Sequence, residues 1–190
     1  MKILTILFPV AMLFIAASPA SETYTLTKDY KVTISGTSNL HNWDEKVESV
    51  SGTSAVVLGT NGSFEINAVK MIMVVNSIKS DIKAMDKNTY KALKADADPD
   101  ITLTMDEPIK AEAKATTIST NCKLTIAGVT KPIVMQVKIS MPQKGTIDFS
   151  GSQKIKMTDY GVTPPKALFG ALVTGDDITI SFSTTFSQSK

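Results

Sequence analysis

The single histidine of the chain lies close in sequence to a serine and an aspartate. Ser38, His41 and Asp44 carry the side chains of a nucleophile, a general base and an orienting acid. Such a group catalyses acyl transfer when its members also meet in space, and closeness in sequence does not establish that. We therefore interpret His41 as a turn residue beside Trp43, with its backbone hydrogen bonds satisfied. On this basis we expect the protein not to be an enzyme.

A group of acidic residues has the spacing of a calcium-binding loop. Counted from Asp96, aspartates stand at positions one, three and five, and Glu107 stands at position twelve. Position six of such a loop needs a glycine for its sharp turn, but Ile101 stands there and begins an alternating pattern. We therefore predict a solvated acidic loop between a helix and a strand, and no metal site.

Other cofactor sites lack the residues that they require. One histidine and one cysteine cannot form a zinc site or a Cys-X-X-Cys haem attachment. Glycine-rich phosphate-binding motifs are absent from the sequence. Cys122 shares the alternation of Leu124 and Ile126, so we expect it to be a small buried apolar residue. We expect no cofactor beyond a bound lipid.

The charge of the chain argues against a polyanionic partner. All 20 lysine-plus-arginine residues are lysines, and with 18 acidic residues they give a net charge of +2. The planar guanidinium group that nucleic-acid sites favour is therefore missing, and no basic field is present. With 190 residues, of which 43% are hydrophobic, the composition is that of one packed domain that does not bind nucleic acid.

The first twenty residues have the features of a secretory signal peptide. Lys2 precedes an apolar run over residues 3–17, and Ser18 and Ala20 are small residues at the expected cleavage site. The run is shorter than the roughly 20 residues that span a bilayer. We predict that residues 1–20 are removed, that residues 21–190 form the mature domain in the periplasm, and that this domain has no transmembrane segment.

Apolar residues recur at every second position through most of the chain. The pattern is clear in 101–105, 133–139 and 178–182, and it indicates strands with one buried face. Turn sequences such as 59–62 separate the strands and favour antiparallel pairing. The spacing from Met85 to Ala95 instead predicts one amphipathic helix. We predict an all-β fold, a closed antiparallel barrel of about eight strands with one short helical insertion, because closure removes exposed edges.

Three alternating alanines predict open space inside that barrel. Residues 109–118 combine helix propensity with alternation, and we interpret them as a strand. Ala111, Ala113 and Ala115 then face inward, at positions where larger side chains would fill the lumen. Of the nine methionines, the seven that remain after removal of residues 1–20 supply flexible apolar lining elsewhere. We therefore predict an apolar cavity of a kind that holds a ligand.

Eight segments of the chain, in order, form a recognisable set: Gly36–Trp43, Asn76–Ser80, Met85–Lys87, Ala92–Lys94, Pro99–Leu103, Leu124–Pro132, Lys156–Val162 and Pro164–Pro165. Together they resemble the YceI-like family of exported lipid-binding proteins. The resemblance implies a lipocalin-like barrel with a helical insertion, which holds a long isoprenoid or related lipid tail, usually in the periplasm. The chain departs from better-known members at the helix start, where they often carry Arg-Asp and it has Met85-Asp86-Lys87.

From these observations we interpret the protein as a non-enzymatic carrier or storage protein for a polyisoprenoid or isoprenoid-quinone tail. Fatty acids or other amphiphiles are the close alternative ligands, and a homodimer is an open alternative for the assembly. The candidate lumen residues are Trp43, Met73, Leu93, Met105, Ala113, Met135, Phe149, Met157 and Phe169.

Two rival hypotheses belong to other classes of function. One is an envelope stress or structural module with a fully packed barrel, which contacts a partner through Tyr160, Val162, Pro164 and Pro165. The other is an enzyme that acts on an envelope lipid with His41 as its base. A cavity too small for a lipid tail would favour the first rival.

Overall fold

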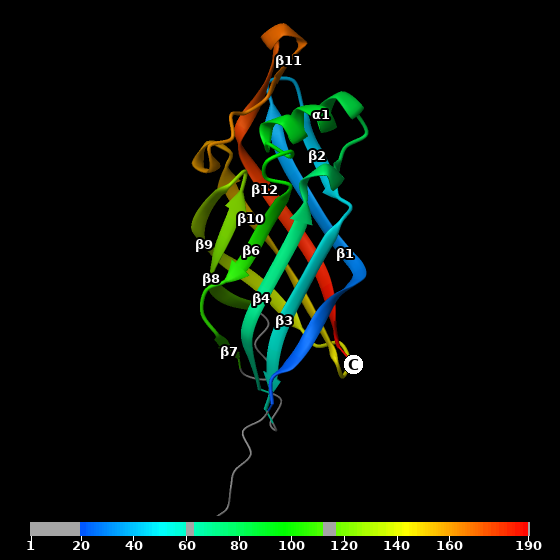
Figure 1. Cartoon of the computed structure of the whole chain (residues 1–190), viewed down its shortest axis with the longest axis vertical. Helices are drawn as coiled ribbons and strands as arrows, with labels where there is room; N and C mark the ends of the chain where they lie inside the picture. Colours follow the sequence, from blue (N-terminus) through cyan, green and yellow to red (C-terminus); the bar gives the residue numbers. More distant parts are fainter. Residues whose placement is uncertain (1–19, 60–62, 112–116, 190) are drawn as a thin grey trace, which may run out of the picture.

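The computed structural model describes residues 20–59, 63–111 and 117–189, and most of these residues lie in strands (Figure 1). The helical elements are α1 (Lys83–Ala92) and the short 3₁₀ segments η1 (Val75–Ser77), η2 (Thr158–Tyr160) and η3 (Leu168–Gly170). The strands are β1 (Glu22–Ser38), β2 (Asn42–Val47), β3 (Val50–Leu58), β4 (Phe64–Val74), β5 (Ile78–Lys79), β6 (Asp100–Met105), β7 (Ile109–Ala111), β8 (Thr117–Ile126), β9 (Val129–Ser140), β10 (Thr146–Lys156), β11 (Lys166–Ala167) and β12 (Leu172–Gln188).

Eight strands in the described part of the chain form a closed antiparallel barrel. Their order is β12, β10, β9, β8, β6, β4, β3 and β1, and the pairing of β1 with β12 closes the ring. That seam runs from Tyr24 opposite Gln188 to Ser38 opposite Thr174. The predicted barrel with one short helix is confirmed.

The strand β1 is shared between two neighbours because it is longer than the barrel wall needs. At its start it pairs with β3 over Glu22–Thr25, and near its end it pairs with β2 over Thr33–Thr37. The hairpin of β1 and β2 therefore extends beyond the ring at the end where α1 lies, which we call the upper end (Figure 1). The opposite end, near the C-terminus, is the lower end.

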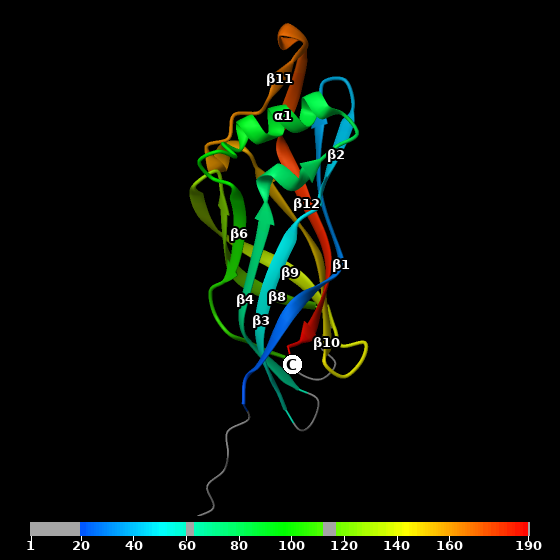
Figure 2. The same cartoon turned by 45° about the vertical axis from the view of Figure 1, so that its right-hand side comes forward.

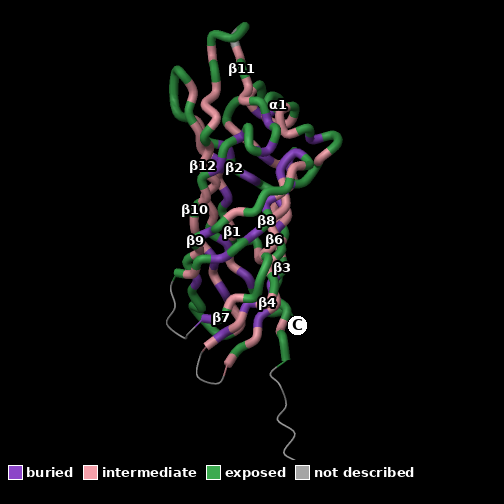
Figure 3. Tube along the Cα trace, turned by 90° about the vertical axis from the view of Figure 1, so that its left-hand side faces the viewer, coloured by how far each residue is buried: buried purple, intermediate pink, exposed green. Residues whose placement is uncertain are grey.

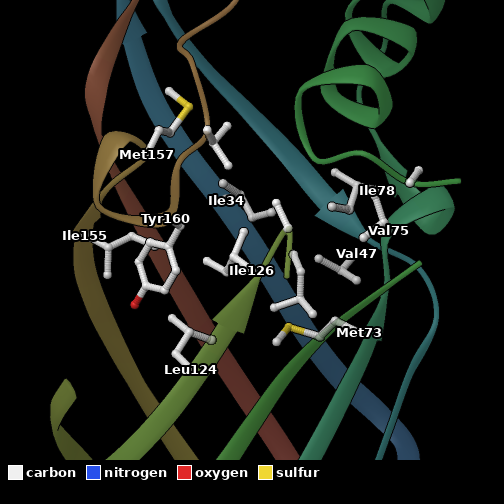
Figure 4. Close-up of a cluster of buried hydrophobic side chains, with 14 of the residues drawn as sticks. Ile34, Val47, Met73, Val75, Ile78, Leu124, Ile126, Ile155, Met157 and Tyr160 are labelled. Carbon is white, nitrogen blue, oxygen red and sulfur yellow. The ribbon is translucent and has the colours of Figure 1, made fainter. Parts of the chain in front are cut away.

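Buried and exposed residues alternate along the strands, as the period-two pattern predicts (Figure 3). The inward side chains form two hydrophobic clusters. The lower cluster includes Tyr24, Ile66 and Phe186. The upper cluster includes Ile34, Met73, Ile126 and further side chains of β8, β10 and η2 (Figure 4).

Helix α1 lies across the upper end of the barrel (Figure 2). Its bounds are Lys83–Ala92, whereas the sequence pattern predicts 85–95. The helix stops early because Lys94 adopts a left-handed φ of 55°, while the backbone N–H of Ala95 donates to the carbonyl of Tyr90 at 2.9 Å. This is the hydrogen-bond pattern of a Schellman-type helix end.

Two further predictions about the barrel wall can be compared with the structure. Residues 109–118 are strand wherever they are described, in β7 and at the start of β8, and Ala111 is buried in the lower cluster as predicted. Ala113 and Ala115 lie outside the described residues. Cys122 is buried, as predicted, and burial raises the pKa of its thiol.

Candidate functional site

The interior of the barrel contains two cavities, one at each level. The lower cavity has a volume of about 100 Å³ and an almost wholly apolar wall, to which Met105, Met135 and Phe149 contribute. The rings of Phe149 and Phe186 both line this cavity and meet edge to face, with centroids 5.4 Å apart. This cavity is smaller than the roughly 300 Å³ at which ligand sites usually begin.

The upper cavity is the larger of the two, with a volume of about 360 Å³. It lies between α1 and the inner faces of β1, β2, β10 and β12. Trp43, Leu93 and Met157 belong to its wall, and Ile180 lines both cavities. Ile180 is therefore a residue that a molecule in either cavity would contact.

Trp43 is placed by a glycine on the neighbouring strand. Gly36 pairs directly with Trp43, and a Cβ atom at Gly36 would lie 2.3 Å from Cζ2 of the indole. Any larger residue at position 36 would therefore displace the ring. The indole N–H donates to the carbonyl of Thr37 at 3.0 Å, which leaves the ring face as apolar cavity wall.

The turn between β1 and β2 is fixed to the start of β12 by one asparagine. The side-chain amide of Asn39 donates to the carbonyl of Ala171, and its Oδ1 accepts from the N–H of Val173, each at 2.9 Å. Within the turn, the hydroxyl of Ser38 accepts from the N–H of His41 and donates to its carbonyl. Both strands that approach the mouth of the upper cavity are therefore held in place.

These contacts bear on the hypothesis that His41 is a catalytic base. Its backbone is hydrogen-bonded within the turn, as predicted, and its side chain lines the upper cavity. The hydroxyl of Ser38 is engaged by the turn backbone, and Asp44 is exposed on β2. The described residues therefore do not assemble a nucleophile, base and acid from Ser38, His41 and Asp44.

Glu45 is the most unusual residue of the upper cavity wall. In β2, Trp43, Glu45 and Val47 alternate with exposed residues, so the strand directs a carboxyl group inward. Only 2% of its surface is exposed. The hydroxyl of Thr89 on α1 donates to Oε1 of Glu45 at 2.7 Å. Burial raises the pKa of Glu45 from 4.5 to about 7, although the hydrogen bond from Thr89 acts in the opposite direction.

A second buried carboxylate fixes the position of α1. Oδ1 of Asp86 accepts from the backbone N–H of Ser80 at 2.8 Å and from its hydroxyl at 2.7 Å. The hydrogen bonds from Ser80 hold the pKa of Asp86 below its ordinary value. At the other end of the helix, the hydroxyl of Tyr90 donates to the carbonyl of Ile78 at 2.8 Å and accepts from the amino group of Lys79. Met85, which precedes Asp86, lines the upper cavity.

The structure places the predicted lumen residues in three groups. Trp43, Leu93 and Met157 line the upper cavity. The lower cavity is lined by Met73, Met105, Met135 and Phe149. Ala113 lies outside the described residues. Whether any of the seven lining residues contacts a ligand stays a prediction.

The placement of Phe169 in the lumen is wrong. Phe169 belongs to η3, between β11 and β12, which projects beyond the upper end of the barrel (Figure 1). It has a left-handed φ of 56°, and its side chain is fully exposed. In such a tight turn the strand alternation no longer determines which way a side chain points.

Two residues assigned to a partner-binding surface are also misplaced. Tyr160 and Val162 are buried, and both line the upper cavity. Burial raises the pKa of Tyr160. The fully packed barrel required by the structural-module hypothesis also does not occur, since the upper cavity is open.

Sequence reasoning missed the polar part of the upper cavity, which includes Glu45, Asn88 and Thr89. A signal for Glu45 was present, because it shares the inward phase of Trp43.

Among the described residues, no group of three histidine, cysteine, aspartate or glutamate side chains could hold a metal ion. In the same residues, no helix combines the length and apolar character needed to cross a membrane.

A model of the YceI-like domain matches residues 24–186, which is nearly the whole described barrel. The chain belongs to the YceI-like family. No curated protein matches it in sequence. Solved structures at 13–20% identity share its fold.

Three solved structures illustrate how this YceI-like barrel compares with others. A polyisoprenoid binding domain from Saccharophagus degradans, implicated in plant cell wall breakdown, is 13% identical with a TM-score of 0.68, over 90% of this chain and 100% of the other. BcnA from Burkholderia cenocepacia is 18% identical with a TM-score of 0.64, over 82% and 95%. The YceI protein of Campylobacter jejuni is 20% identical with a TM-score of 0.59, over 100% and 99%.

Proposed function

We propose that the protein is a non-enzymatic carrier or storage protein for a lipid with a long apolar tail, either a polyisoprenoid or an isoprenoid quinone. The observation that carries the proposal is the upper cavity of about 360 Å³. It is within the size range of ligand sites, and Ile180 lines both it and a second apolar cavity below. A tail that begins under α1 and displaces the side chain of Ile180 would follow the barrel axis.

Burial of the tail supplies the driving force for binding. Each methylene group removed from water contributes about 0.8 kcal/mol, so a tail of several isoprene units needs no strong polar contact. The methionines at positions 71, 73, 105 and 135 of the lower wall can change rotamer with little cost as a tail enters. We expect this flexibility to let the lower cavity, of about 100 Å³, widen around a tail.

Two further observations support this proposal. The chain shares its fold with a domain described as polyisoprenoid binding. The sequence of residues 1–20 is typical of a secretory signal peptide, so we place the carrier in the periplasm, where a lipid that moves between membranes needs a protein to shield its tail from water.

The test is to identify what the protein carries and then to block the cavity. Protein purified without detergent is extracted with organic solvent, the extract is analysed by mass spectrometry, and binding of added prenyl quinone is measured by fluorescence quenching of Trp43. We expect an isoprenoid lipid in the extract and saturable quenching. A fatty acid in the extract would assign the alternative ligand class, and an empty extract together with no quenching would refute a carrier function.

A pair of variants shows whether bound lipid occupies the upper cavity. Ala92 lines it, and Ala97 is exposed just beyond α1. We expect Ala92→Phe to reduce the lipid recovered and Ala97→Phe to leave it unchanged, with both proteins keeping the circular dichroism of the wild type. Equal recovery from both variants would place the lipid elsewhere.

A further inference from the structure

The upper cavity has a carboxyl group in a wall that is otherwise largely apolar. The carboxyl of Glu45 is held on one side only: Oε1 accepts from Thr89, and Oε2 has no hydrogen-bond partner among the described residues. Oε2 is not one of the fully buried unpaired atoms of the described residues, so it is accessible to a small molecule in the cavity. Since Glu45 lines the cavity, a ligand there is the group in position to satisfy Oε2.

The charges around Glu45 do not neutralise it. Asp86 on α1 acts on Glu45 as a like charge and disfavours its ionisation. Lys79 on β5 is engaged by Tyr90, and no lysine among the described residues comes within ion-pair distance of Glu45. The other titratable side chains of the cavity wall are His41, Tyr160 and Lys166.

We propose that Glu45 selects the head group of the bound lipid, so that the cavity accepts an uncharged, hydrogen-bonding head and rejects an anionic one. This inference rests on the proposed lipid-carrier function and names the ligand class for the same site. The accepted heads are a hydroxyl, as in a prenyl alcohol or quinol, or a carbonyl, as in a quinone. The rejected heads are a phosphate or a carboxylate.

The selection follows from the two states of the carboxyl group. Ionised, Oε2 accepts a hydrogen bond from a hydroxyl; protonated, it donates one to a carbonyl. The pKa of about 7 keeps both states accessible near neutral pH. An anionic head beside the ionised form meets a like charge in a site shielded from water, where repulsion is stronger than in solution. A lipid with an anionic head group therefore binds only if Glu45 or the head group is first protonated.

The experiment compares two probes with the same tail, geranylgeraniol and geranylgeranyl phosphate, at pH 8. The measured quantity is the ratio of their dissociation constants, because the phosphate is also better solvated in water. We expect Glu45→Gln to shift the ratio toward the phosphate by about tenfold, which is the size expected from removing one nearby like charge. Asp44→Asn makes the same change of charge on the exposed face of the same strand and should leave the ratio unchanged.

The outcomes separate this inference from the carrier function. If Glu45→Gln leaves the ratio of dissociation constants at its wild-type value, head-group selection by Glu45 is overturned. The same holds if Asp44→Asn shifts the ratio as much as Glu45→Gln does. In both cases lipid binding itself would still stand. If wild type binds neither probe, the carrier function fails and the selection fails with it. Glu45→Met, which removes the charge at similar volume, gives the same test if the Gln variant does not fold, and it should shift the ratio in the same direction.

Discussion

The lower and upper halves of the barrel are built from the same strands but differ in how their interiors are filled. In the lower half, large side chains such as Tyr24, Phe149 and Phe186 pack together and leave about 100 Å³. In the upper half, the ring of strands ends beneath α1, and the space between them has about 360 Å³. We therefore expect side chains that line the lower cavity to contribute mainly to stability, and those that line the upper cavity to contribute mainly to ligand binding.

The two halves also differ in polarity. The lower cavity wall is almost wholly apolar, whereas the upper wall includes Glu45 and Thr89. A tail and a polar head therefore have different places in the same lumen. The comparison predicts that substitutions below affect mainly stability and that substitutions above affect mainly binding.

The largest expected effect is on stability in the lower half. Phe186 is 1% exposed and contacts Phe149 edge to face, so Phe186→Ala should lower the free energy of unfolding by about 3–5 kcal/mol. Met157 borders a space that is already open, and Met157→Ala should cost about 2 kcal/mol, at the low end for such a change. Urea unfolding followed by circular dichroism measures both. Equal losses would show that the halves contribute alike.

Next in size is the pH dependence that Glu45 introduces in the upper half. Its folded pKa is about 7 and its ordinary value is 4.5, so the folded protein binds more protons than the unfolded chain between these values. Glu45 therefore lowers stability as pH rises from about 4.5 to 7, and its effect is constant above that range. Glu45→Gln should gain about 3 kcal/mol over wild type between pH 4.5 and 8. Thermal unfolding at a series of pH values tests this, with Asp44→Asn as the control, and a constant difference between Glu45→Gln and wild type would contradict it.

A smaller effect is expected where the two halves meet. Ile180 lines both cavities, and Ile180→Trp should block passage between them. We expect about tenfold weaker binding of the long prenyl alcohol solanesol, equivalent to about 1.4 kcal/mol, with little change for the short farnesol. Thr179→Trp places the same ring on the opposite face of β12 and serves as the control. If both alcohols weaken equally, the tail does not extend into the lower half.

The smallest effect is expected at the projecting turn above the barrel. The side chain of Phe169 is fully exposed, so Phe169→Ser should change the free energy of unfolding by less than about 0.5 kcal/mol. The same variant should keep the wild-type affinity for prenyl quinone, because Phe169 lines neither cavity. A clear loss of affinity would mean that this turn folds over the mouth when lipid is bound.

Strand alternation was enough to predict the fold. Val32 and Ile34 on β1 pair with Phe182 and Ile180 on β12 across the seam. The alternation within each strand already predicts that these residues face inward. The lining positions of Met135, Phe149 and Met157 followed from the same rule. These residues lie within regular strands or directly after one, where each side chain's direction follows from its neighbour's.

The rule failed where the backbone leaves the strand, or where a polar residue occupies an inward position. Phe169 lies in a turn with positive φ, and Tyr160 lies in the 3₁₀ segment η2. The period-two pattern of strands therefore does not predict which way either side chain points. Glu45 followed the period, but a glutamate is usually exposed. The distance to Thr89 depends on how α1 crosses the barrel end, which no local pattern specifies.

The amide of Asn39, which joins the β1–β2 turn to Ala171 and Val173, has a consequence for how a guest molecule gets in and out. The seam between β1 and β12 is held by these two hydrogen bonds at the end nearest the upper cavity, so we expect the strands to stay together there. Among the described residues, helix α1 has one side-chain hydrogen bond to β2, from Thr89 to Glu45, and several to residues 78–80 on its other side. We therefore expect a guest to enter and leave beneath the β2 side of α1, where only the hydrogen bond from Thr89 has to break.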